Sequence, residues 1–116
     1  MNLKICSQSD IFLFTNRSAK IWGPENGRPV IATCGWLDNA GSFDTLIPLL
    51  PKDLLIVAVD TPGHGLSDPF PPDIAYNYLD AVVAIERLSK QLKWEKFSLI
   101  GHSLGGCVTM VYAGIF

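Results

Sequence analysis

The chain has 116 residues, of which 48% are hydrophobic and 17% are charged, and its formal net charge is −2. This length leaves room for one small domain, and the apolar fraction is high enough to form a core, which argues against a disordered chain. The basic residues are scattered along the sequence, so we expect neither a nucleic-acid-binding surface nor a polybasic membrane patch.

The composition also bears on the compartment. The longest uninterrupted apolar run, residues 54–59, is far shorter than the ~18 residues that a membrane-spanning helix needs. The first residues lack the sustained apolar stretch of a signal peptide. The three cysteines include no C-x-x-C pair, which fits a reducing compartment and apolar packing better than disulfides. We therefore expect a cytoplasmic protein with no membrane span.

The first half of the chain favours strands. Residues 3–6, 11–14 and 19–22 are short strand candidates within a β-rich start at residues 1–23, and a turn rich in proline and glycine follows. Residues 30–33 are a short apolar strand. After a loop, Ser42 or Asp44 can cap a helix that reaches Leu50, and Pro48 is expected to kink or shorten it.

The second half alternates between strands and helices. Residues 54–59 are apolar on both faces, as buried parallel strands are. Residues 76–92 carry apolar side chains at helical spacing, residues 97–100 form the next strand, and a last helix starts at residue 104. The resulting βαβαβα series over residues 30–116 predicts an α/β fold in a single domain, with a mostly parallel sheet and helices on both faces.

The sequence GHSLG at residues 101–105 is the most informative motif. It follows the strand at residues 97–100 and leads into the last helix, which is the setting of a nucleophile elbow. In such an elbow the serine lies on a strained turn, and the positions two before and two after it must be nearly free of side chain. Gly101 and Gly105 meet this demand, which makes Ser103 the candidate nucleophile. The alternative is that Ser103 only caps the last helix.

A serine nucleophile also needs two backbone N–H groups that stabilise the developing negative charge. The residue after the nucleophile, Leu104, is expected to supply one of them, and Trp36, in the loop after the first parallel strand, is expected to supply the other. The alternative for the segment of Cys34, Gly35 and Trp36 is an ordinary turn with a buried tryptophan.

The sequence offers no convincing catalytic base or triad acid. His102 adjoins Ser103, and the strained turn is expected to aim its side chain away from the serine hydroxyl. His64 lies in a rigid turn and is expected to be a structural, hydrogen-bonded histidine. Asp60, at a strand end, is expected to be a carboxylate bonded to backbone N–H groups that orders the loop.

Cofactor and metal motifs are absent from the sequence. It has no phosphate-binding Gly-Lys-Ser or Gly-Lys-Thr, no complete dinucleotide fingerprint and no cluster with the spacing of metal ligands. We therefore expect neither a cofactor nor a metal ion.

Three ordered motifs together resemble the α/β-hydrolase superfamily. They are GHSLGG at residues 101–106, DTPGHGLS at residues 60–67 and CGWLDNAGSFD at residues 34–44. The last motif is most similar to the serine hydrolase-like, kraken-type group, although Cys34 stands where the family usually has a histidine. The resemblance implies that the chain covers about the first five strands of an eight-stranded sheet and lacks the C-terminal strands.

This resemblance implies a serine hydrolase that acts on a small-molecule ester, amide or related acyl substrate, whose acid and histidine follow the serine in the chain. Neither has a counterpart within these 116 residues, so we expect the chain to be an N-terminal part that is inactive by itself. The alternative is a truncated, non-catalytic protein or interaction module. In the 116-residue chain by itself, the strand at residues 97–100 is expected to be an unprotected sheet edge and a site of self-association. The resemblance to this group also implies, as an alternative to the cytoplasm, that the protein associates with peroxisomes.

Overall fold

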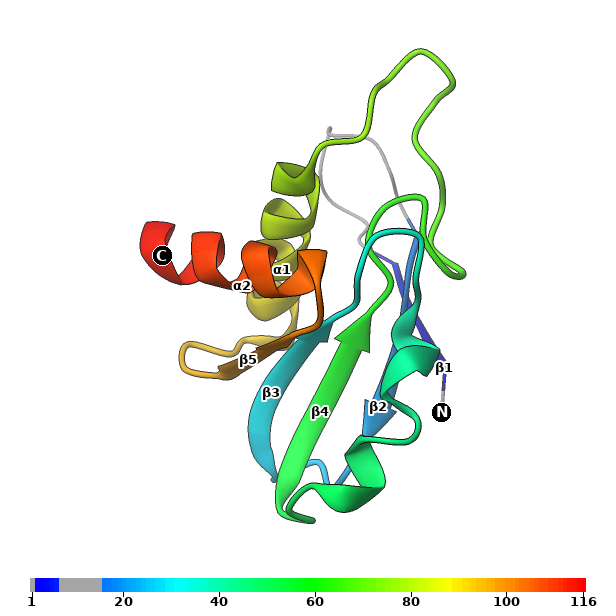
Figure 1. The fold of residues 1–116 in the computed structure, drawn as a ribbon. Coiled ribbons are helices and arrows are strands. Elements are labelled where there is room, and N and C mark those ends of the chain that lie inside the picture. The colour runs from blue at the N-terminus through cyan, green and yellow to red at the C-terminus, as the bar shows by residue number, and fades with distance from the viewer. Residues whose placement is uncertain (1, 7–15) are drawn as a thin grey trace.

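The computed structural model of the chain describes residues 2–6 and 16–116. The strand proposed at residues 11–14 lies outside the described residues. The other strands of the sequence analysis are present, and they form one five-stranded sheet in the order β1-β2-β4-β3-β5 (Figure 1). The strands are β1 (Asn2–Cys6), β2 (Asn16–Trp22), β3 (Arg28–Thr33), β4 (Leu54–Val59) and β5 (Ser98–Gly101).

The three strands in the second part of the sheet are parallel. β3 pairs in parallel with β4 on one side and with β5 on the other, whereas β1–β2 and β2–β4 are antiparallel pairs. β3 and β4 have buried residues on both faces over their last four positions, which explains why they are continuous apolar runs. The predicted α/β architecture is therefore confirmed.

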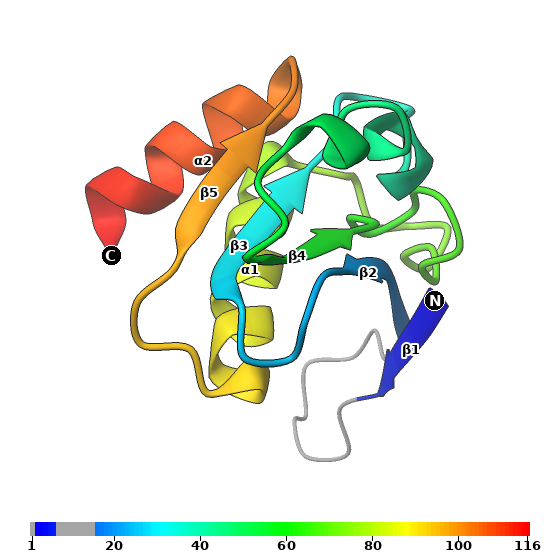
Figure 2. The same ribbon diagram turned by 90° about the horizontal axis from the view of Figure 1, so that it is seen from below.

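Both α-helices, α1 (Tyr78–Leu92) and α2 (Leu104–Ile115), cover the same face of the sheet (Figure 2). α1 begins at a capping box, in which the Asn77 side chain accepts the Leu79 N–H at 3.0 Å and the Asp80 carboxylate accepts the Asn77 N–H at 2.8 Å. It ends at Lys93, whose backbone is left-handed with a φ of 58°. The helix predicted at residues 76–92 is thus confirmed, with its start at Tyr78.

Within the described residues, the helices on the opposite face of the sheet are short 3-10 helices. They are η1 (Ala40–Phe43) and η2 (Ile47–Leu49), and Ala40, Phe43 and Ile47 pack there against β3 and β4. The single helix predicted from Ser42 or Asp44 to Leu50 is therefore wrong. Pro48 lies in the first turn of η2, and its ring and missing N–H prevent an α-helix from running through this segment.

The carboxyl ends of the three parallel strands lie at the same level. Thr33, the last residue of β3, is in register with Val59 at the end of β4 and with Gly101 at the end of β5. The loops that follow these strands contain Trp36, Asp60 and Ser103, so the register brings the predicted site residues to one edge of the sheet.

β5 is an edge strand of this sheet, at the opposite edge from β1, and among the described strands its partner is β3 (Figure 1). The position expected for the strand at residues 97–100 is thus confirmed, while self-association through this edge stays a prediction. Within the part of the chain that the structure describes, no helix has the length and apolarity needed to cross a membrane.

Candidate active site

Ser103 lies on the sharp turn between β5 and α2. Its backbone has a φ of 56° and a ψ of −121°, a region that residues with a side chain seldom occupy. The serine is exposed, and its side chain makes no capping hydrogen bond to α2. This geometry argues against the helix-cap alternative and matches what a nucleophile elbow requires.

The strain at this turn makes a prediction about stability. Ser103→Gly is expected to be more stable than Ser103→Ala by about 1 kcal/mol, because glycine adopts a positive φ without a clash while alanine keeps the strain. Urea unfolding of the two variants measures the difference. A glycine variant that is no more stable than the alanine variant would contradict the strained turn.

Two glycines allow the chain to close up around the serine. A Cβ on Gly101 would lie 2.5 Å from the carbonyl carbon of Gly105. A Cβ on Gly105 would lie 2.7 Å from the carbonyl oxygen of Cys34 and closer still to that of Thr33. The Thr33 hydroxyl also donates to the Gly105 carbonyl oxygen at 3.2 Å. Gly105 therefore lets α2 contact the end of β3, whereas a Cβ on Gly106 would meet only an ordinary contact at 3.6 Å.

The two N–H groups expected to stabilise negative charge belong to residues of one pocket. Trp36 and Leu104 both line a pocket of about 30 Å³, together with Gly35 and His64. Among the hydrogen bonds of the described residues, none uses the N–H of Trp36 or that of Leu104. Gly35 lies close to the elbow, since a Cβ on it would be 3.2 Å from the Ser103 Cβ. The loop after β3 is thus placed against the serine turn.

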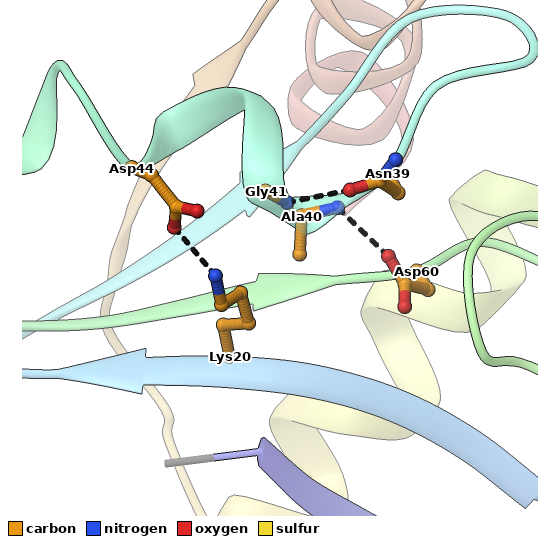
Figure 3. Close-up of polar contacts among 6 residues, drawn as sticks. All are labelled: Lys20, Asn39, Ala40, Gly41, Asp44 and Asp60. Carbon is orange, nitrogen blue, oxygen red and sulfur yellow. Dashed lines mark hydrogen bonds and ion pairs between the residues drawn. The ribbon is translucent and has the colours of Figure 1, made fainter.

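The Asp60 carboxylate orders the loops that surround this pocket. It is buried and accepts the Ala40 N–H at 2.8 Å (Figure 3). It also accepts the Leu66 N–H at 3.0 Å. The Ser67 hydroxyl donates to the Asp60 backbone carbonyl at 2.6 Å and accepts the Ser18 N–H at 2.9 Å. The expectation that Asp60 is bonded to backbone N–H groups is confirmed. It connects the loop after β3 with the loop after β4.

Asp60→Asn is expected to lower the free energy of unfolding by about 1–3 kcal/mol, because the new amide group cannot accept the second N–H and would face it with its own. Asp44→Asn is a matched control, since Asp44 forms an exposed ion pair with Lys20 at 2.6 Å (Figure 3). Exposed pairs contribute less than about 1 kcal/mol. Urea unfolding of both variants is the measurement, and equal losses would contradict the role of Asp60.

Neither histidine is hydrogen-bonded to the serine. Nδ1 of His64 lies 2.9 Å from the Pro62 carbonyl oxygen, and the ring packs edge-on against Trp36 with centroids 5.4 Å apart. His64 is thus the hydrogen-bonded histidine that the sequence indicates. His102 is exposed, and its backbone N–H donates to the Thr33 carbonyl at 3.1 Å. Within the described residues, the serine has no partner that could act as a base.

Cys34 occupies a buried position directly after β3. Burial, followed by the negative charges of Asp38 and Asp60, raises the pKa of its thiol to about 11. The neighbouring Asp38 has a lowered pKa because the Ser42 hydroxyl and the Asn39 N–H donate to its carboxylate. Cys34 is therefore a neutral packing residue at the edge of the candidate site.

This pKa predicts a contrast between two cysteines. At pH 8, iodoacetamide is expected to alkylate the exposed Cys107 and to leave Cys34 unmodified until the protein is unfolded. Alkylation of both sites is quantified by peptide mass spectrometry. Equal rates in the folded protein would contradict the burial of Cys34.

The raised pKa of the Cys34 thiol also affects stability. An unfolded thiol ionises near pH 9 and the folded one near 11, so the native state loses stability as pH rises through this window.

Some residues of the site are not identified by the sequence analysis. Thr33 makes a buried hydrogen bond from the end of β3 to α2, and Ser67 makes one from the loop after β4 to β2. Tyr76 lines the same pocket as His64. Ser67 belongs to the DTPGHGLS motif at residues 60–67, whereas nothing in the sequence distinguishes Thr33 or Tyr76 from other residues. Among the described residues, no group of histidine, cysteine or carboxylate side chains could hold a metal ion.

Comparisons with known proteins agree with this geometry. The family model for the alpha/beta hydrolase fold matches residues 28–116. A serine hydrolase-like protein of Danio rerio is 45% identical over 97 residues, which cover 84% of this chain and 30% of that protein. A serine hydrolase-like protein of Homo sapiens is 52% identical over 91 residues, covering 78% and 45%. The chain thus spans less than half the length of these relatives.

A solved structure shows the same fold. A hypothetical protein of Pseudomonas aeruginosa PAO1 superposes with a TM-score of 0.87 and 40% sequence identity, over 97% of this chain and 38% of that one. The matched family model includes both the loop after β3 and the serine turn. The chain therefore belongs to the α/β-hydrolase family and carries an N-terminal portion of its fold.

Proposed function

We propose that this chain carries the nucleophile of a serine hydrolase. The Ser103 Oγ attacks the carbonyl carbon of a small-molecule ester, amide or related acyl substrate, and its proton passes to a base. The carbonyl oxygen becomes an oxyanion, and collapse of the intermediate expels the alcohol or amine, which takes up that proton. Water then attacks the acyl-serine and releases the acid.

One observation carries this proposal: Ser103 is exposed on a strained turn between β5 and α2, with a φ of 56°. A residue with a side chain persists in this region only where the surrounding structure enforces it. Here Gly101 and Gly105 remove the side chains that would hold the strand and the helix apart. The strain has no evident structural use other than presenting the hydroxyl.

The N–H groups of Leu104 and Trp36 are proposed to bind the oxyanion. They belong to residues of the same pocket and are free of hydrogen bonds to the described residues. The Asp60 carboxylate supports this arrangement by holding the Ala40 N–H at 2.8 Å, which anchors the loop that contains Trp36. Donors fixed in advance stabilise the charge at no reorganisation cost when it develops.

The general base and the triad acid are proposed to come from polypeptide outside these 116 residues. The chain spans 30% of the Danio rerio relative, and neither His64 nor His102 bonds to Ser103. A non-catalytic, interaction-only role is the second candidate, because the described residues offer no base. The two differ in whether Ser103 is an activated nucleophile.

A fluorophosphonate probe tests this difference, because its reaction requires an activated serine. The natural, full-length protein is treated with the probe, and the tryptic peptide that begins at Phe97 is sequenced by mass spectrometry. We expect the label on Ser103 and its loss in Ser103→Ala. Ser98→Ala is the matched control, since Ser98 is an exposed serine on β5 in the same peptide, and it should label normally. An unlabelled Ser103 in the natural protein supports the non-catalytic candidate.

A further inference from the structure

Tyr76 lines the same pocket as Trp36 and Leu104, the two residues whose N–H groups are proposed to bind the oxyanion. It lies at the end of the long loop between β4 and α1, directly before Asn77, which caps α1. Tyr76 is 39% exposed and Trp36 is 56% exposed, so both aromatic side chains present accessible surface. Tyr76 is therefore a lining residue within reach of a bound molecule.

Three contacts hold the Tyr76 ring in place. The ring stacks on the Phe70 ring, with the planes 12° apart and the centroids 4.9 Å apart. Its hydroxyl oxygen accepts the Phe70 N–H at 2.9 Å. The hydroxyl end of the ring also lies against the backbone of Gly63, because a Cβ on Gly63 would be 2.5 Å from the hydroxyl oxygen. A rotation of the ring away from the pocket would break all three contacts.

Other lining residues of the pocket belong to the core. Thr33, Cys34 and Val108 line it and are between 0% and 4% exposed. Gly105 also lines it, at the point where α2 contacts the end of β3. These atoms cannot recede unless α2 moves away from the sheet, because protein interiors are close-packed. Any polypeptide that packs here in the natural protein adds to these walls.

The pocket is small for a ligand site. It measures about 30 Å³, whereas the pockets that take up drug-sized ligands measure about 300–1,000 Å³. A space of this size suits an acyl group as small as acetyl and excludes a long alkyl chain. Since the core side of the pocket cannot recede, a longer chain would have to displace the Tyr76 ring.

We infer that this pocket receives the acyl group of the substrate and that Tyr76 limits the length of that group. The inference rests on the proposed function and names its substrate class, the esters of short-chain acids. The Trp36 and Leu104 N–H groups are proposed to hold the carbonyl oxygen, and the acyl chain is bonded to the same carbonyl carbon. The chain therefore has to lie next to these two residues, in the pocket that they line with Tyr76. Tyr76 is thus a specificity-determining residue that takes no part in bond making.

A series of p-nitrophenyl esters tests this inference on the natural, full-length protein. Acetate, butyrate and octanoate esters are compared by kcat/KM, each divided by its rate of spontaneous hydrolysis, and we expect the values to fall with chain length. Tyr76→Ala is expected to raise the ratio of octanoate to acetate about tenfold or more, because one methylene in an apolar pocket already changes kcat/KM by about tenfold or more. Tyr76→Phe keeps the ring and its stack on Phe70, and it should keep the preference for acetate.

Phe70→Ala tests whether the ring has to be held. Phe70 stacks on Tyr76 but is not one of the residues that line the pocket. Its removal is expected to shift the ratio in the same direction as Tyr76→Ala, although Tyr76 itself is retained. Leu49→Ala is the control, because Leu49 is an exposed apolar residue of η2 outside the pocket. This variant should leave the ratio unchanged.

The outcomes distinguish this inference from the proposed function. If the unmodified protein hydrolyses the octanoate ester as well as the acetate ester, or if Tyr76→Ala leaves the ratio unchanged, the inference is overturned while the hydrolase proposal stands. An unchanged ratio in Phe70→Ala contradicts the role of the stack in holding the ring. The chain-length profile of the unmodified protein needs no variant, so it decides the matter even if a variant fails to fold. If no ester is hydrolysed and Ser103 is not labelled, the proposed function fails and the inference fails with it.

Discussion

Ser103→Ala is expected to lower the kcat of ester hydrolysis by the natural, full-length protein by about 10⁴-fold or more. Removal of the hydroxyl leaves no atom that can form the acyl-serine, and only substrate binding and the proposed oxyanion site can still promote attack by water. The change should not disturb the fold, because the Ser103 side chain is exposed and makes no capping bond. The measurement is kcat for an activated ester, with the far-UV circular dichroism spectrum as a check of folding.

Ser98→Ala is the matched control for this experiment. Ser98 is an exposed serine at the start of β5, at the opposite end of the strand from the elbow. We expect this variant to retain the activity of the unmodified protein. If Ser103→Ala retained more than about a tenth of that activity, the hydrolysis would have to use another nucleophile.

Gly105→Ala is expected to lower the free energy of unfolding by about 3 kcal/mol or more. The new Cβ would overlap the carbonyl oxygens at the end of β3, those of Thr33 and Cys34, which are backbone atoms and cannot rotate away. Relief of the clash requires α2 to move away from the sheet, and the buried hydrogen bond from Thr33 to the Gly105 carbonyl would be lost. Urea unfolding and the yield of soluble protein are the measurements.

Gly106→Ala is the control that isolates this contact. It is the same substitution one residue later in α2, where the nearest atom to a new Cβ is the Gly101 carbonyl oxygen at 3.6 Å. We expect a neutral effect or a gain of up to about 1 kcal/mol, because alanine is the better helix former. Similar stability for the two variants would show that the elbow does not need a bare backbone at Gly105.

The parallel part of the sheet could be predicted from the sequence, because buried parallel strands are continuous apolar runs. Residues 54–59 are such a run and match β4 in both bounds. α1 could be predicted from its apolar spacing, and its cap at Asn77 corrects the start by two residues. The failure between β3 and β4 has a physical reason: the apolar spacing around Pro48 also suits two separate 3-10 turns, which the packing against the sheet selects.

The sequence predicts helices on both faces of the sheet, because strands and helices alternate along the chain. The alternation does not state which element covers which face. Both α1 and α2 lie on one side (Figure 2), and among the described elements η1 and η2 cover the other. The segment at residues 40–50 is thus a thin layer of two 3-10 helices. Its buried side chains, Ala40, Phe43 and Ile47, cover this face of the sheet.

The position of Ser103 could be predicted because the whole motif lies within five consecutive residues, in which Gly101 and Gly105 flank the serine. The contacts of Asp60 and His64 depend on partners brought together by the fold, such as Ala40 and Trp36. The sequence indicates their structural character but not these partners. Thr33 could not be identified from the sequence. Nothing in a threonine at the end of a strand indicates which helix residue its hydroxyl contacts, and here that residue is Gly105.

The most direct test of the account is to trap the acyl-serine that it requires. The natural, full-length protein is mixed with p-nitrophenyl acetate, quenched with acid during the steady state and digested, and the peptide that begins at Phe97 is sequenced by mass spectrometry. The account predicts an acetyl group on Ser103 that is absent in Ser103→Ala and present in Ser98→Ala. Hydrolysis that continues with the acetyl group on another residue, or with no acetylated residue, would contradict it.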